Sequence, residues 1–89
     1  MKVELGKTGL KTTFQDDFPE ETKCVKCGHI SRIAFVAHET DEKSIIKGGQ
    51  YVCELHEGSK GNLWPHDACC VAVYFCKECL QPTALYNQA

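Results

Sequence analysis

Two Cys-x-x-Cys pairs, at 24–27 and 76–79, constrain the fold of this chain more than any other feature. The chain has 89 residues, which is the length of one domain. A domain this small buries a limited core and commonly needs a disulfide or a metal as a staple. Seven cysteines are near the level of a staple-dependent scaffold. The pairs therefore form disulfides, carry out redox chemistry or bind a metal.

Three observations argue against disulfides and redox chemistry. Residues 1–14 have no apolar core or small-residue cleavage site of a signal peptide, and no apolar run approaches the ~18 residues of a membrane span. We therefore expect a cytoplasmic protein without membrane contact, in a compartment that keeps thiols reduced. An odd number of cysteines also fits disulfide pairing poorly. A thioredoxin-like role needs a pair at a helix N-terminus within a βαβ unit, and neither pair has that context.

Metal binding is the remaining interpretation of the two pairs. Zn²⁺ takes four ligands in a tetrahedron with Zn–S bonds of ~2.3 Å, and a Cys-x-x-Cys turn aims two sulfurs at one ion. Two such turns complete the shell when a sheet brings them together. The sequence therefore predicts one structural zinc with four ligands, which are Cys24, Cys27, Cys76 and Cys79.

The two stretches CVKCG, 24–28, and CKEC, 76–79, resemble the knuckles of the zinc-ribbon (rubredoxin-like) families. This resemblance implies a small metal-stapled, mostly-β domain with a three-stranded antiparallel sheet and a structural zinc between the knuckles. Two features depart from the family pattern. Leu80 stands where these families usually have a glycine such as Gly28. The gap between the pairs also exceeds the usual ~15–20 residues, which an insertion containing 41–62 explains.

Alternating apolar residues predict strands over 29–37, 50–56 and 69–75. In the first of these strands, Ile33 and Phe35 would share one face. The segment 41–47 has the end signals of a short helix, but a strand that enters a glycine turn fits it equally well.

The domain organisation follows from these elements. Residues 1–20 form a leader that could contain a small hairpin, because two short alternating runs flank GKTG. Residues 21–82 form the zinc-ribbon-like domain with its long insertion, and residues 83–89 form a C-terminal tail.

The motifs CELH and HDAC suggest a second metal site, because they mirror each other as Cys-x-x-His and His-x-x-Cys. Its ligands would be Cys53, His56, His66 and Cys69, with Cys70 as an alternative fourth ligand. The competing interpretation is that the cysteines are small buried hydrophobic residues. A regular strand would aim Cys53 and His56 at opposite faces, so ligation would need the strand to end or bulge between them. The other histidines, His29 and His38, are expected at the surface or at a strand edge.

Charge and ligand chemistry limit the function. The net charge of −2 would become about −4 with four thiolates and a divalent ion, which disfavours nucleic acid as a partner. Another protein is the expected partner, and Trp64 is either an anchor for it or a cap on the core. A rubredoxin-like iron electron carrier and a nucleic-acid-binding zinc ribbon remain alternatives.

We expect no enzymatic activity and no small-molecule substrate. Four cysteine ligands leave no open position on the zinc for water. Only the second site, with fewer than four ligands, could be catalytic, and Glu54 or Asp67 would then be the nearby base.

Overall fold

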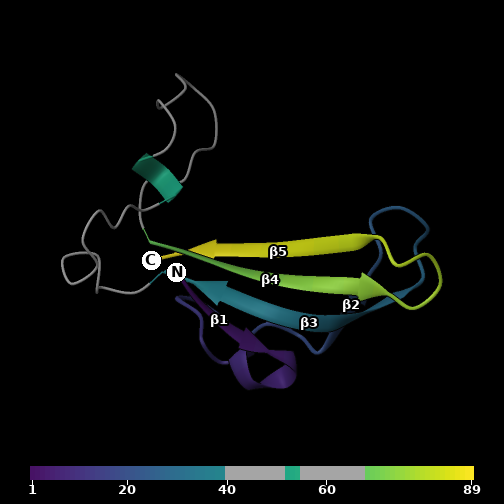
Figure 1. Cartoon of the computed structure of the whole chain (residues 1–89), viewed down its shortest axis with the longest axis horizontal. Coiled ribbons are helices and arrows are strands. Elements are labelled where there is room, and N and C mark those ends of the chain that lie inside the picture. Colours follow the sequence, from purple (N-terminus) through teal and green to yellow (C-terminus); the bar gives the residue numbers. More distant parts are fainter. Residues whose placement is uncertain (40–51, 55–67) are drawn as a thin grey trace.

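The structure is a computed structural model, and it describes residues 1–39, 52–54 and 68–89. These residues form one antiparallel sheet (Figure 1). The strand order is β1-β3-β4-β5, and β2 also pairs with β3. The elements in chain order are β1 (Lys2–Leu5), the 3-10 turn η1 (Gly6–Gly9), β2 (Glu21–Lys23), β3 (Ile30–His38), the 3-10 turn η3 (Val52–Glu54), β4 (Cys69–Cys76) and β5 (Pro82–Gln88).

The expectation of a three-stranded sheet is wrong, because this sheet has five strands. One of the additional strands is β5, which pairs with β4 along its whole length and includes most of the residues that the sequence analysis assigned to a tail. The turn at 76–81 reverses the chain and sends it back beside β4. The inward-facing residues of β5 include the polar Thr83 and Asn87, which are buried. The strand therefore lacks the alternation of apolar residues by which a strand is predicted from sequence.

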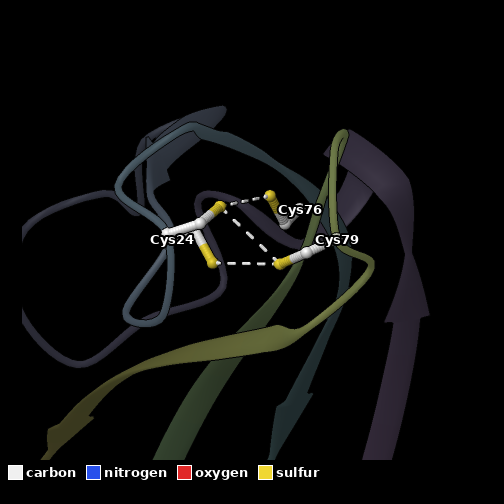
Figure 2. A group of neighbouring side chains, drawn as sticks. Cys24, Cys76 and Cys79 are labelled. Carbon is white, nitrogen blue, oxygen red and sulfur yellow. Dashed lines mark hydrogen bonds between the residues drawn. The ribbon is translucent and has the colours of Figure 1, made fainter.

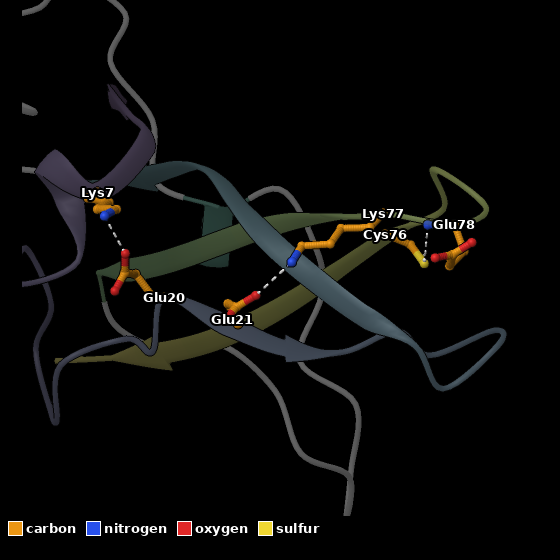
Figure 3. Close-up of polar contacts among 6 residues, drawn as sticks. All are labelled: Lys7, Glu20, Glu21, Cys76, Lys77 and Glu78. Carbon is orange, nitrogen blue, oxygen red and sulfur yellow. Dashed lines mark hydrogen bonds and ion pairs between the residues drawn. The ribbon is translucent and has the colours of Figure 1, made fainter.

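The strands β1 and β2 also lie outside the predicted strands, and β1 comes from the N-terminal leader. It pairs with the end of β3, from Lys2 opposite His38 to Leu5 opposite Phe35. Residues 6–9 then form η1, where the sequence analysis expected the turn of a hairpin. An ion pair of 2.6 Å between Lys7 and Glu20 links η1 to the residues before β2 (Figure 3).

The two predicted strands over 29–37 and 69–75 are confirmed as β3 and β4, but the faces of β3 differ from the prediction. Ile33 lies opposite Tyr74, and Phe35 lies opposite Val73. Because Val73 and Tyr74 are consecutive in β4, Ile33 and Phe35 lie on opposite faces of the sheet. The prediction that they share a face is wrong, since a β-bulge between them inserts one residue and reverses the alternation.

The core lies between one face of the sheet and the N-terminal segment 6–20. It consists of Phe18 and four sheet residues, which are Val36, Cys70, Ala72 and Tyr74. The Tyr74 hydroxyl donates a hydrogen bond of 2.6 Å to the Pro19 carbonyl, and the Cys70 thiol donates one of 2.9 Å to the Thr12 carbonyl. These bonds hold the segment against the sheet and satisfy two of its carbonyl groups.

Replacing Gly9 by alanine is expected to lower the free energy of unfolding by about 1–3 kcal/mol, because η1 packs directly on β3. A Cβ atom at this position would lie 2.7 Å from the Val36 Cβ and 3.1 Å from the Glu4 Cβ. Urea unfolding at saturating zinc measures the effect. The control is Lys11→Ala on the exposed surface, with an expected change within about 0.5 kcal/mol. Equal stabilities of the two variants would contradict this close packing.

Several predicted elements fall wholly or partly outside the described residues. The segment 41–47 is one of them, so its helix or strand stays a prediction, as does most of the predicted strand 50–56. The part of that strand that the structure describes, Val52–Glu54, is a 3-10 turn instead. Within the described part of the chain, no helix is long and apolar enough to span a membrane.

Candidate metal centre

Four cysteine sulfurs converge at the end of the sheet where β2 meets β3 and β4 meets β5 (Figure 2). Cys24 and Cys27 lie in the turn between β2 and β3, and Cys76 and Cys79 lie in the turn between β4 and β5. The central pair β3–β4 brings these turns together, because Ser31 of β3 lies opposite Cys76. All four Sγ atoms lie within 4.8 Å of one another.

The distances between the sulfurs fit a tetrahedral metal site. The Cys27 and Cys76 sulfurs are 3.4 Å apart, and the Cys79 sulfur is 3.7 Å from both the Cys24 and the Cys27 sulfurs. A tetrahedron with Zn–S bonds of ~2.3 Å has S···S edges of about 3.8 Å, whereas a disulfide bond is about 2.05 Å long. The four residues therefore match a divalent or trivalent metal with a four-sulfur shell, and they are not paired as disulfides.

The first knuckle is held by three hydrogen bonds that backbone N–H groups donate around Cys24. The Cys24 N–H donates to the His29 carbonyl at 2.7 Å, and the Gly28 N–H donates to the Cys24 carbonyl at 3.1 Å. The Lys26 N–H donates to the Cys24 sulfur at 3.4 Å. Gly28 has φ of 78°, a left-handed conformation that glycine adopts without a steric penalty.

The second knuckle repeats the same pattern around Cys76. The Cys76 N–H donates to the Gln81 carbonyl at 3.2 Å, and the Leu80 N–H donates to the Cys76 carbonyl at 3.1 Å. The Glu78 N–H donates to the Cys76 sulfur at 3.4 Å, as Figure 3 shows. Leu80 has φ of 61° and therefore adopts the left-handed conformation of Gly28. The departure from glycine at this position leaves the turn geometry intact.

The left-handed backbone conformation costs free energy at Leu80 but not at Gly28. Substitutions at these two equivalent positions should therefore have opposite effects on stability. Leu80→Gly is expected to raise the free energy of unfolding by about 0.5 kcal/mol, because relief of about 1–2 kcal/mol of left-handed strain outweighs the greater freedom of glycine in the unfolded chain. Leu80 is 74% exposed, so the change removes little buried surface. Gly28→Ala is expected to lower the same quantity by about 1 kcal/mol.

Thermal melting at a fixed excess of zinc compares the two variants with the parent protein. Opposite shifts of the melting temperature support the equivalence of Leu80 and Gly28. A melting temperature that falls in Leu80→Gly would show that the leucine side chain contributes more than its conformation costs.

The backbone amides also favour the thiolate form of the first cysteine in each knuckle. The N–H groups of Cys27 and Lys26 lower the pKa of Cys24 to about 6. The N–H groups of Cys79 and Glu78 likewise lower the pKa of Cys76. These two sulfurs are buried, and the amide dipoles that face them are in place to stabilise negative charge.

The second cysteine of the first knuckle lies in a different environment, because its side chain is exposed at the rim of the site. A hydrogen bond from the His29 backbone lowers the pKa of Cys27. Partial desolvation and the hydrogen bonds to the other three cysteine sulfurs together outweigh it and raise the pKa to about 12. The His29 ring also contacts this sulfur, with 3.3 Å between Nδ1 and Sγ. His29 is exposed, in agreement with the prediction of a surface or strand-edge residue, but its contact with the sulfur was not predicted. The available signal was its position two residues after Cys27.

The predicted second site is described only in part. His56 and His66 lie outside the described residues, and for Cys53 the structure describes the backbone. Cys69 is buried, with its sulfur 3.5 Å from the Tyr86 hydroxyl. Cys70 faces the core on the other side of the sheet, where burial raises its pKa to about 11, so it is poorly placed as an alternative ligand.

Among the side chains that the structure describes, Cys24, Cys27, Cys76 and Cys79 are the only group of three or more potential metal ligands with such close ligand atoms. Comparison with family models, with curated proteins and with solved structures finds no match to this chain. The zinc-ribbon resemblance therefore depends on the two knuckles alone. The fold supports a coarser conclusion, which is a small antiparallel sheet with a four-cysteine cluster that could bind a metal.

Proposed function

We propose that this chain binds a structural Zn²⁺ ion through Cys24, Cys27, Cys76 and Cys79. The observation that carries this proposal is the tetrahedral spacing of the four sulfurs, together with backbone N–H groups that already face the two buried ones. Four thiolates saturate a tetrahedral ion and leave no position for substrate or water, so the ion acts in folding and not in catalysis.

The position of the site explains what the ion would hold together. One knuckle connects β2 to β3, and the other connects β4 to β5. A single ion bound to both would tie these two turns at the same end of the sheet, which a core as small as this one secures only weakly.

Elemental analysis and native mass spectrometry of protein purified without added metal test the proposal. At least one zinc per chain is expected, and Cys76→Ser should lose it. Bound iron with a red colour would favour the rubredoxin-like alternative, because a four-sulfur tetrahedron accepts either metal. Protein that folds without any metal would contradict a structural ion.

We further propose that the domain is a protein-interaction module that uses the face of the sheet opposite the core. The strand register aligns apolar residues in two rows across four strands of this face. One row consists of Leu5, Phe35, Val73 and Ala84, and the other consists of Val3, Ala37, Val71 and Tyr86. Leu5, Val3 and Tyr86 are exposed, as is Phe75 next to the first row.

The chemistry of this face favours a protein partner over nucleic acid. The two rows contain no charged residue, and a contiguous apolar patch of this kind marks a macromolecular contact. The charged residues near the metal end include both signs, as in the ion pair of 3.3 Å between Lys77 and Glu21 (Figure 3). A nucleic-acid site would need a continuous basic stripe, and the net charge of −2 has the wrong sign.

Site-specific photo-crosslinking in the native cell tests the interaction. A crosslinking amino acid at Phe75 should capture one protein that the same amino acid at the exposed Lys11 position does not capture. The purified partner should then bind the parent chain and lose at least tenfold in affinity for Phe75→Lys. Equal crosslinking from both positions, or salt-sensitive binding to generic DNA with the metal-loaded chain, would contradict the proposal.

A further inference from the structure

A buried carboxylate lies at the other end of the sheet from the four-cysteine cluster. Glu39, the residue after β3, is only 4% exposed. Its Oε1 atom accepts a hydrogen bond of 3.1 Å from the Val52 N–H, and its Oε2 atom has no hydrogen-bond partner in the described part of the chain. An ionised carboxylate is costly to bury unless a cation or a metal compensates its charge.

The strand register places this carboxylate beside a cysteine. The Glu39 N–H donates to the Cys69 carbonyl at 2.9 Å, directly after the pair of His38 and Cys70. Glu39 and Cys69 are therefore cross-strand neighbours on one face, with Cβ atoms about 5.5 Å apart. Cys69 is 1% exposed. Two potential metal ligands are thus buried together at the edge of the apolar face.

A third potential ligand comes from the turn η3. The hydrogen bond from the Val52 N–H fixes the start of this turn against the Glu39 carboxylate. Cys53 is the next residue, so the backbone of η3 brings it to the same end of the sheet. The mirrored motifs CELH and HDAC already pair Cys53 with Cys69, and the fold adds the buried Glu39 carboxylate between the two segments.

A second buried polar group at this end of the sheet also lacks a partner. His38 was expected at the surface or at a strand edge. It is the last residue of β3, its side chain is buried, and its Nε2 atom has no hydrogen-bond partner among the described residues. The alternation of β3 places His38 on the core face, opposite to Glu39. His38 is therefore not a member of the ligand set.

We propose that Glu39 is a ligand of a second zinc ion, together with Cys53 and Cys69. Carboxylate oxygen and thiolate sulfur are both established zinc ligands, and a zinc ion at Glu39 would compensate the buried charge. Glu39 and Cys69 are the members of the set whose side chains the structure describes. This site is separate from the four-cysteine cluster, which lies at the opposite end of β3 and β4, and it does not depend on it.

Zinc titration of the metal-free full-length chain, followed by native mass spectrometry, tests this inference. Two zinc ions per chain are expected in the parent protein. Glu39→Gln keeps the shape of the side chain and the acceptor for the Val52 N–H, and it should weaken the second zinc at least tenfold while the first stays bound. Cys69→Ser should have the same effect.

Two matched controls separate ligation from packing. Cys70→Ser changes the adjacent cysteine, which faces the core, and His38→Gln changes the adjacent buried polar residue on the core face. Both should still bind two zinc ions. A loss of the second zinc in these controls equal to that in Glu39→Gln would overturn the assignment, because it would show that any change of packing there releases the ion.

X-ray absorption of the parent protein with two zinc ions provides a test that needs no variant. Four sulfurs at one site and two at the other give an average of about three sulfurs per zinc, with oxygen or nitrogen for the remainder. An average of four sulfurs would overturn the proposal, as would binding of only one zinc per chain. Failure to bind any metal would instead refute the four-cysteine site, so the two proposals fail in different ways.

Discussion

Removal of the metal from the four-cysteine site is expected to unfold the sheet. A structural zinc contributes an apparent binding free energy of about 10–16 kcal/mol in small modules, which equals or exceeds the ~5–15 kcal/mol stability of a typical domain. Cys76→Ser removes a buried sulfur of the four-cysteine cluster, at the end of β4, that accepts the Glu78 N–H. This variant and the chelated parent protein should therefore both lose their strand signal in circular dichroism and their cooperative melting transition.

The control for this experiment is Lys77→Ala, the residue next to Cys76. It breaks the ion pair with Glu21, in which both side chains are nearly half exposed, so the expected loss of stability is below about 1 kcal/mol. Its metal content should remain that of the parent protein. A fully zinc-free protein with unchanged circular dichroism and melting temperature would rule out a structural role for the ion.

Tyr74→Ala is expected to produce the largest loss of stability among core variants, about 3–5 kcal/mol at saturating zinc. Tyr74 is the largest fully buried side chain among the described residues, it belongs to the core cluster with Phe18 and Val36, and its hydroxyl donates to the Pro19 carbonyl. Tyr74→Phe isolates the hydrogen bond, and its loss should cost about 1–2 kcal/mol. Urea unfolding of both variants, with metal content verified, measures these changes.

Phe75 offers a matched control, because it is the next aromatic residue in β4 and lies on the opposite face. Its side chain is 46% exposed, so Phe75→Ala should cost roughly 1 kcal/mol, well below the cost of Tyr74→Ala. Similar losses at the two positions would show that both faces of β4 are buried to the same extent, against the fold described above.

The four-cysteine cluster could be predicted from the sequence because the spacing of a knuckle is a local property. A Cys-x-x-Cys turn closes through hydrogen bonds between residues at most five apart, as around Cys24 and Cys76, so its spacing can be recognised in the sequence. The left-handed backbone at Gly28 was predictable for the same reason. That Leu80 adopts this conformation was not, since propensity alone disfavours it and the rest of the knuckle imposes it.

The extent of the sheet depended on contacts that no local pattern encodes. β5 carries buried polar residues, Thr83 and Asn87, whose partners lie more than fifty residues away in the chain. Thr83 Oγ1 accepts the Val25 N–H at 3.0 Å, and this bond links the first knuckle to β5. Residues that appear polar and tail-like in the sequence are therefore strand residues once these partners are in place.

The sequence by itself determined the chemistry of this protein: four cysteines at knuckle spacing, and two strands long and apolar enough to carry them. Only the tertiary structure decided which face of those strands is buried. In β4 the apolar side chains of Val71, Val73 and Phe75 predict that their face is the buried one. The core is instead formed by Cys70, Ala72 and Tyr74, because the segment 6–20 covers their side of the sheet. Alternation defines two faces, and the part of the chain that packs against one of them determines which becomes the interior.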